Sequence, residues 1–293
     1  MELHIDPHVH SALSDGTDAP RDLLLRAREV GLDVVGAVDH DTFDHWASFH
    51  EAHAELLAAG ANPPAVLLGS EISTSVGLQP VHLLVYLPDP SRGHLRAVLQ
   101  NVHDERLVRL QRMVENISTD YPITWAEVIA EVPGLTPGRP HLGDALVKKG
   151  YFATRSEAFD RVLGPHSPYY VSRPVVDTFE VVAAGLADGG VPVIAHPFAA
   201  KRGKRPLQAD TVRDLARAGV AGIEVYHREL GAAPRDLALG LAEELGLFVS
   251  GGSDYHGRGK PNVLGENLMP SSSLEPILQR GATPLLGELP TRN

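Results

Sequence analysis

Uninterrupted apolar runs alternate with amphipathic stretches along most of this chain. Residues 33–40 (DVVGAVDH), 65–74 (AVLLGSEIST) and 191–197 (VPVIAHP) are almost wholly apolar until their last positions, as expected of strands buried on both faces. Amphipathic segments with apolar residues at helical spacing lie between such runs. The predicted strands are 5–10, 33–40, 65–74, 81–88, 191–197, 222–227 and 247–256, and the predicted helices are 18–31, 43–60, 91–117, 177–189, 209–218 and 234–245. This alternation predicts an α/β fold.

One pair of strands breaks the alternation. About six residues separate the runs 65–74 and 81–88, whereas a parallel crossover needs about a dozen or more. A hairpin is therefore predicted here. In a hairpin the start of the second strand lies beside the end of the first, so we expect His82 close to Glu71.

The middle of the chain has a different pattern. Residues 118–176 contain helical pieces such as TWAEVIAEV and LGDALVKKG, no buried-strand run, and several prolines, which interrupt regular structure. We predict that residues 1–99 and 183–293 form a barrel, and that residues 100–182 form a helical insertion that shapes a substrate pocket.

Ionisable residues gather where the predicted strands end. His8 and His10 share one face of the first strand, and Asp15 lies in the loop that follows. The carboxyl ends of successive buried strands are where α/β barrels and doubly wound sheets place functional residues. One histidine at a strand end is usually structural, but five strands of seven end in His, Asp or Glu. We therefore predict a metal cluster.

Composition narrows the kind of site. The 293 residues with 43% apolar content suffice for one large barrel or two ordinary domains. The chain has no cysteine, which excludes disulfides and thiolate ligands and leaves His, Asp and Glu to hold a metal. We expect a cytoplasmic protein, because neither a signal peptide nor an apolar run of about 18 residues is found.

The formal net charge of −11 argues against a broad nucleic-acid footprint, which is normally basic. No membrane association and no obligate protein partner are expected. Because the formal charge counts no bound metals, the local charge at a metal site can be positive.

Seven motifs resemble, in order, those of the PHP (polymerase and histidinol phosphatase) family: HVHSALSDGT, VVGAVDHDT, GSEIS, VHLLVYL, GRPH, AHP and GGSDYHG. They span most of the chain. The resemblance is greatest to stand-alone bacterial phosphoesterases that act on nucleoside 5′-monophosphates, on 3′,5′-bisphosphates and on the 5′ ends of short RNA. It implies a distorted (β/α)7 TIM-like barrel with two or three divalent metals at its C-terminal rim.

The resemblance also implies how the metals are held. Its three ligand sets are His8, His10, Glu71 and Asp254, then Asp15, His40 and His256, and then Glu71, His82 and His196. Glu71 would bridge two metals. The sequence departs from the family pattern at Pro7, which indicates a local irregularity, and in the segment GPHSPYYV.

The positive charge of three divalent ions exceeds the negative charge of three carboxylate ligands, so the site would attract a phosphate dianion. We expect direct in-line attack by a metal-bound hydroxide, with no nucleophilic side chain. The predicted catalytic residues are Asp15, His196 and His227, with one of the two histidines as proton donor to the leaving group.

Other residues would act around the metals. Arg139, His141 and Arg173 are predicted to bind the substrate phosphate. Asp39 could orient His40 or its neighbours, as carboxylates do around metal-bound imidazoles, or it could cap the following helix.

The predicted activity is hydrolysis of nucleotide phosphomonoesters, such as 5′-AMP and 3′,5′-nucleoside bisphosphates, and of 5′ ends of short single-stranded RNA. Histidinol-phosphate phosphatase is an alternative with the same metals, and an exonuclease module serving a polymerase is a third reading. A non-catalytic, metal-stabilised binding module is the alternative of another class. His/Asp/Glu sites accept Mn, Fe, Zn or Mg, so the sequence leaves the metal open.

Overall fold

The computed structural model describes residues 2–132, 137–172, 176–199 and 206–290. At its centre is an eight-stranded sheet, with seven strands in the order β1-β2-β3-β4-β6-β7-β8 and the short β5 beside β3. The strands are β1 (Ile5–Asp6), β2 (Val34–Ala37), β3 (Ala65–Val76), β4 (Gln79–Tyr86), β5 (Val176–Asp177), β6 (Val191–Ala195), β7 (Gly222–Tyr226) and β8 (Phe248–Gly251). The seven predicted strands are confirmed, and β5 is an additional strand.

The two ends of this sheet meet, which closes it into a barrel. Val9, just after β1, pairs in parallel with Tyr255, just after β8. The His10 N–H donates to the Tyr255 carbonyl oxygen, and the Asp254 N–H donates to the His8 carbonyl oxygen, each at 2.9 Å. These bonds join the carboxyl ends of the first and last strands. The predicted α/β, TIM-like barrel is thereby confirmed.

The barrel is distorted because β4 runs against both of its neighbours. It pairs antiparallel with β3 and with β6, whereas the other pairs along the barrel are parallel. Gly77, with φ of 57°, and Leu78 form the two-residue turn, and a glycine at the first turn position suits the twist of a hairpin. The predicted hairpin is confirmed, and it places His82 opposite Ser73.

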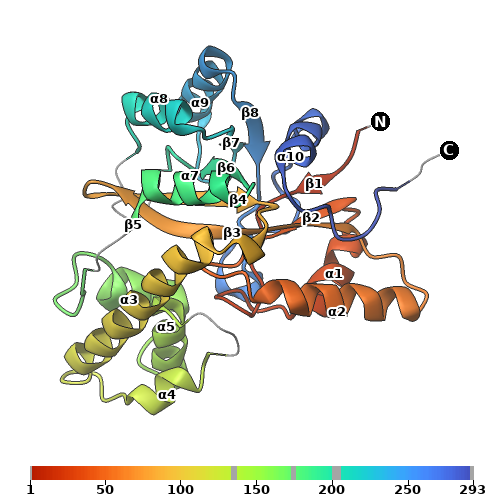
Figure 1. The fold of residues 1–293 in the computed structure, drawn as a ribbon. Helices are drawn as coiled ribbons and strands as arrows, with labels where there is room; N and C mark the ends of the chain where they lie inside the picture. The colour runs from red at the N-terminus through yellow and green to blue at the C-terminus, as the bar shows by residue number, and fades with distance from the viewer. Residues whose placement is uncertain (1, 133–136, 173–175, 200–205, 291–293) are drawn as a thin grey trace.

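Helices cover the outside of the barrel (Figure 1). They are α1 (Pro20–Glu29), α2 (His45–Ala58), α3 (His94–Ile117), α4 (Trp125–Ile129), α5 (Arg139–Lys148), α6 (Arg155–Ala158), α7 (Thr178–Ala187), α8 (Ala209–Ala218), α9 (Ala232–Leu245) and α10 (Leu274–Arg280). Figure 1 shows α1 and α2 on one side of the sheet, α7, α8 and α9 on another, and α3, α4 and α5 grouped together. The apolar pattern did not predict α10.

The helix expected from residue 91 begins instead at His94, for a reason that lies elsewhere in the chain. The buried carboxylate of Asp188 accepts the Leu95 N–H at 2.8 Å and the His94 N–H at 3.3 Å. It therefore caps α3 from the end of α7. Such a cap from a distant element has no local sequence signal.

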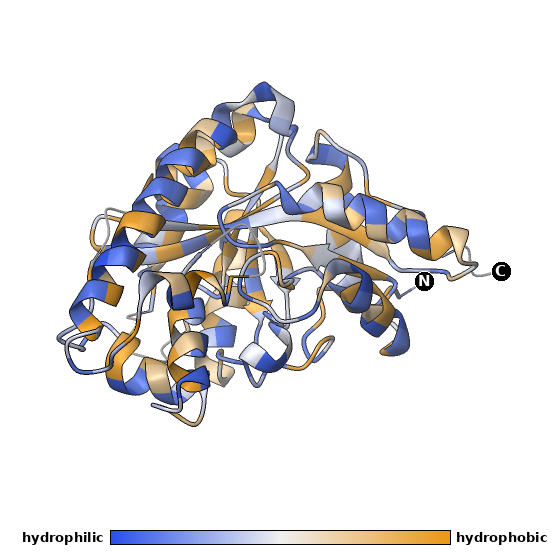
Figure 2. Ribbon diagram, turned by 90° about the horizontal axis from the view of Figure 1, so that it is seen from below, coloured by the Kyte–Doolittle hydropathy of each residue, from blue (hydrophilic) through white to orange (hydrophobic). Residues whose placement is uncertain are grey.

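Side chains inside the barrel change from apolar to ionisable along the strands. Val34, Leu67, Leu84 and Val193 belong to one buried cluster in the interior. Alternate residues of a strand share a face, so Glu71 lies on the same face of β3 as Leu67, nearer the carboxyl end. The barrel therefore has an apolar floor beneath an ionisable rim. Figure 2 shows the hydrophobic residues concentrated along the central strands and the striped polarity of the helices.

The second half of α3 shares a separate hydrophobic cluster with α4, α5 and α6. It includes Leu110, Met113, Val128, Leu146 and Leu163. These side chains pack together rather than against the barrel strands. Among the described helices, none is long and apolar enough to cross a membrane.

The backbone of Gly36 in β2 packs closely against Pro7, just after β1. A Cβ atom at this position would lie 1.8 Å from the carbonyl oxygen of Pro7. The expected irregularity at Pro7 is present, since β1 ends at Asp6. We expect Gly36→Ala to lower the free energy of unfolding by roughly 2 to 3 kcal/mol, as overpacking does, measured by urea denaturation.

Gly240→Ala is the matched control. Gly240 is a helical residue of α9, and a Cβ there meets nothing within 4 Å. Alanine should raise stability there by about 0.5 to 1 kcal/mol. Equal effects of the two substitutions would contradict the close approach of Gly36 to Pro7.

Candidate metal centre

Nine ionisable side chains from six strands and their loops converge at the carboxyl rim of the barrel. They are His8, His10, Asp15, His40, Glu71, His82, His196, Asp254 and His256, and they form three overlapping groups. Within each group, one nitrogen or oxygen atom of every residue lies within 4.8 Å of those of all the others. The structure therefore brings together all the residues that the sequence placed at the metal positions.

The first group consists of His8, His10, Glu71 and Asp254. The Oε2 atom of Glu71 lies 3.2 Å from His8 Nε2 and 3.0 Å from His10 Nε2. The Oδ1 atom of Asp254 lies 3.6 Å and 3.4 Å from the same two nitrogens. All four residues are buried.

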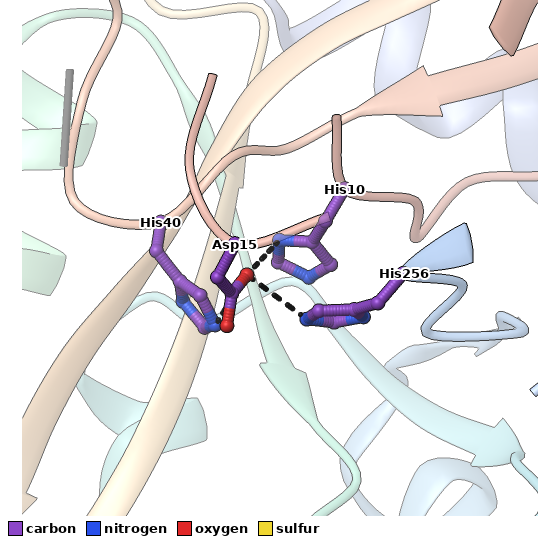
Figure 3. A group of neighbouring side chains, drawn as sticks. All are labelled: His10, Asp15, His40 and His256. Atoms are coloured by element: carbon purple, nitrogen blue, oxygen red, sulfur yellow. Dashed lines mark ion pairs between the residues drawn. The ribbon is translucent and has the colours of Figure 1, made fainter. Parts of the chain in front are cut away.

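The second group surrounds Asp15 (Figure 3). The Oδ1 atom of Asp15 lies 3.1 Å from His256 Nε2, 3.9 Å from His40 Nε2 and 4.0 Å from His10 Nδ1. Figure 3 shows the three imidazoles around this carboxylate, contributed by segments far apart in the sequence. His10 thus takes part in two groups, one through each ring nitrogen.

The third group is the most open. The Oε1 atom of Glu71 lies 2.7 Å from His82 Nδ1 and 3.2 Å from His196 Nε2, and the His82 side chain is 24% exposed. Glu71 therefore uses one oxygen for the first group and the other for the third. This is the arrangement of a bridging carboxylate.

Unpaired buried atoms show that these groups fit metal ions. Within the described part of the chain, five atoms of these nine residues are buried and make no hydrogen bond of good geometry: His10 Nδ1, Asp15 Oδ1, His40 Nδ1, Glu71 Oε2 and His256 Nε2. Leaving a buried polar atom unpaired costs about 1 to 3 kcal/mol. Several such atoms aimed at common points are best satisfied by cations with nitrogen and oxygen ligands.

The local electrostatics also suit cations. Burial alone would raise the pKa of Asp15, but the His256 and His40 imidazoles outweigh it and hold this pKa well below its usual range. For Glu71, His82 and His40 likewise outweigh burial and lower the pKa. Burial lowers the pKa of His40 to about 3. The carboxylates and the His40 imidazole are thus in the forms that bind metals, whereas Asp254 and Glu71 outweigh burial and raise the pKa of His10 to about 9, so a metal that binds His10 would displace a proton.

Backbone strain is concentrated in the same region. His196 and Asp254 have φ of 29° and 52°, and Asp41, beside His40, has φ of 55°. Non-glycine residues seldom adopt such values, which persist where the surrounding structure fixes them. The strain thus accompanies the placement of the ligand side chains.

Known proteins resemble the chain over nearly its whole length. No protein-family model matches it. A solved structure from Bifidobacterium adolescentis, assigned by prediction as a metal-dependent phosphoesterase, has a TM-score of 0.90 and 42% identity, covering 95% of this chain and 96% of that one. The chain belongs to the metal-dependent phosphoesterases. It is thus a phosphoric ester hydrolase.

Two curated relatives of the phosphoesterase have more specific names. A 3′,5′-nucleoside bisphosphate phosphatase of Chromobacterium violaceum is 29% identical over 296 residues, covering 99% of this chain and 97% of the relative. A 5′-3′ exoribonuclease of Haemophilus influenzae is 27% identical over 283 residues, covering 96% and 100%.

Asp39 supports the loop that carries Asp15. Its carboxylate accepts hydrogen bonds from the Ser11 N–H at 2.8 Å, from the Ser11 hydroxyl at 2.6 Å and from the Ser14 hydroxyl. None of these bonds is to His40 or to the start of α2. Asp39 therefore neither orients His40 directly nor caps the following helix through them. In the phosphoesterase Asp39 thus fixes the loop between two rim residues, His10 and Asp15.

Two of the three predicted substrate-binding residues, Arg139 and His141, lie on α5. The Arg139 guanidinium donates to the Leu163 carbonyl oxygen at 3.1 Å and lies over the rings of Phe159 and Tyr170. His141 is buried, and its Nδ1 accepts the Gly138 N–H at 3.1 Å. Arg173 lies outside the described residues.

The sequence patterns missed several charged residues around the rim. Glu224 contacts His8, Lys260 donates to Asp254 Oδ2 at 2.8 Å, and Arg155 donates to the Asp15 carbonyl oxygen at 3.1 Å. Arg106 of α3 pairs with the buried Asp41. Only Glu224 had a clear signal, as a lone carboxylate within the apolar strand GIEVY.

Histidine substitutions should remove metal from the phosphoesterase in a graded way. Loss of a residue that merely supports a ligand typically weakens metal binding by about 10- to 100-fold, so loss of a ligand should cost at least as much. His10→Ala removes a member of two groups and His82→Ala a member of one. We expect His10→Ala to retain fewer Mn²⁺ ions per chain after dialysis, measured by mass spectrometry of the metal. Equal retention by both variants would contradict the shared position of His10.

Proposed function

We propose that this chain is a PHP-family enzyme that hydrolyses nucleotide phosphomonoesters, with 5′-AMP and 3′,5′-nucleoside bisphosphates as substrates and the 5′ ends of short RNA as further ones. The observation that carries the proposal is the set of three ligand groups joined through Glu71 and His10. Similarity to a bisphosphate phosphatase and to an exoribonuclease supports the nucleotide class. In this proposal the enzyme acts in the cytoplasm.

The three groups would hold two or three divalent ions. The first ion would be held by His8, His10, Glu71 and Asp254, the second by Asp15, His40 and His256, and the third by Glu71, His82 and His196. When bound, such ions activate water and neutralise charge on the phosphoryl oxygens. The protein's part is to orient the ligands, bind the phosphate and place a proton donor.

His227 is the better placed of the two candidate proton donors. Its Nδ1 accepts the Glu229 N–H at 3.1 Å, so the neutral ring carries its proton on Nε2. That Nε2 is buried, has no hydrogen-bond partner among the described residues and lies 3.9 Å from Asp254 Oδ2. His196 Nε2 instead belongs to a ligand group. We therefore assign the proton for the leaving oxygen to His227 Nε2.

The helical segment would bind the rest of the substrate. Because His141 Nδ1 accepts a backbone N–H, its neutral ring carries a proton on Nε2 that can be donated to a phosphate oxygen. Arg139, on the same helix, would supply positive charge, and we propose the same role for Arg173. We propose residues 100–182 as the insertion that shapes the pocket, with residues 1–99 and 183–293 as the barrel.

Phosphate release from four compounds tests the proposal. The Mn²⁺-loaded protein should release phosphate from 5′-AMP and 3′,5′-bisphosphoadenosine but not from histidinol phosphate. Shortening of a 5′-phosphorylated RNA, read on a gel, would show that oligonucleotides are also substrates. His10→Ala, prepared in parallel, controls for contaminating phosphatases.

Preference for histidinol phosphate would replace the nucleotide assignment with the histidinol phosphatase alternative. Absence of turnover of all four compounds by the metal-loaded protein would favour a non-catalytic binding module.

Substrates whose leaving groups differ in their need for a proton test the proposed role of His227 as proton donor. We expect His227→Ala to slow hydrolysis of 5′-AMP by roughly 10²- to 10⁴-fold, the usual contribution of a general acid. Hydrolysis of p-nitrophenyl phosphate should slow much less, because nitrophenolate leaves without protonation. Rates with both substrates, at unchanged metal content, provide the measurement. Equal slowing with the two substrates would exclude His227 as the donor.

A further inference from the structure

Glu224 is a buried carboxylate inside the barrel that belongs to none of the three ligand groups. It lies in β7 between Ile223 and Val225, and its side chain is 0% exposed. The β7–β8 register shifts between Glu224 and Tyr226. Residues three apart normally point to opposite faces of a strand, but the irregularity lets both Glu224 and His227 face the rim.

The two oxygens of Glu224 bind two different ligand residues. Oε1 lies 3.0 Å from His8 Nδ1. Oε2 accepts the backbone N–H of His196 at 2.7 Å. With the His8 proton on Nδ1, the lone pair of Nε2 is available to a metal ion on the side of the ring where Glu71 and Asp254 lie. One carboxylate thus holds a ligand of the first group and a ligand of the third.

The second of these bonds acts on a strained residue. His196 has φ of 29° and precedes Pro197, a combination that the backbone disfavours. The Glu224 carboxylate helps to fix the position of the His196 backbone, and with it the imidazole beside Glu71 Oε1. A substitution at Glu224 would therefore shift the His196 ligand of the third group, although it replaces none of that group's own side chains.

The surrounding backbone leaves room for this arrangement at one glycine. A Cβ atom on Gly252 would lie 2.4 Å from the His8 Cβ and 2.7 Å from Glu224 Oε1. Gly252 donates its own N–H to the Tyr226 carbonyl oxygen at 2.9 Å. The contact between Glu224 and His8 thus depends on a residue without a side chain at this position.

We propose that Glu224 is a positioning residue that couples the first and third metal positions, so that occupancy of one strengthens binding at the other. The inference rests on the metal centre of the proposed function but does not depend on its substrate. Both contacts of Glu224 require an acceptor. Glutamine offers one acceptor and one donor, so Glu224→Gln keeps at most one of the two bonds.

Metal-binding isotherms test the coupling without any turnover. We would measure Mn²⁺ bound per chain by equilibrium dialysis for the wild type, Glu224→Gln, His82→Ala and the double variant. Glu224→Gln should weaken binding by about 10- to 100-fold. In the wild-type background His82→Ala should also weaken the sites that remain, whereas with Glu224→Gln present it should weaken them less, because only Glu71 then joins the first and third groups.

Asp188→Asn is the matched control for loss of a buried carboxylate. Asp188 is fully buried and accepts hydrogen bonds from the backbone of His94 and Leu95. Its substitution should lower thermal stability and leave the isotherm unchanged. Restoration of part of the affinity by Glu224→Asp, which keeps two acceptors, would support positioning by the carboxylate.

Additive effects of Glu224→Gln and His82→Ala on metal binding would overturn the coupling. So would a Glu224→Gln isotherm equal to that of the wild type. A coupled isotherm in a protein that hydrolyses none of the four phosphate compounds would reject the proposed function and leave this inference standing.

Discussion

The pairing of the segments that follow the first and last strands holds the site together. Two backbone hydrogen bonds join His8 and His10 to Asp254 and Tyr255, across almost the whole length of the chain. Without this closure, the ligands contributed by the N-terminal and C-terminal ends would have no fixed relation. Barrel formation and assembly of the first ligand group are therefore the same structural event.

The same closure collects ionisable side chains in a region that is largely buried from solvent. Nine ionisable residues lie above an apolar floor, and several of their atoms have no hydrogen-bond partner in the described part of the chain. Burying such groups opposes folding unless a cation compensates them. Because metal that binds the folded chain adds its binding free energy to stability, ions held at this centre would stabilise the barrel as well as serve the proposed chemistry.

Much of this arrangement could be predicted from local patterns. Apolar runs ending in His40, Glu71 or His196 gave both the strands and their functional ends, and the short link before His82 gave the hairpin. The remainder depends on contacts between distant segments. The cap of α3 by Asp188 and the hold of Glu224 on two ligands leave no periodic trace, since each involves one buried carboxylate and a partner far away in the sequence. Asp39 was noticed, but its partners, Ser11 and Ser14, are defined only by the folded loop.

The hydrophobic cluster of α3 to α6 lies apart from the cluster that fills the barrel. The chain enters this helical part through α3 and returns at β5, which pairs with Thr74 and Ser75 at the far end of the long strand β3. Two separately packed hydrophobic clusters thus meet at one rim, where the barrel supplies the ligands and the helical part supplies Arg155 and Arg106, which contact Asp15 and Asp41. Substitutions away from these two contacts can accumulate in the helical part without repacking the ligands. With the proposed roles of the two parts, this division would give such a scaffold an evolutionary route to new substrates while its inorganic chemistry stays constant.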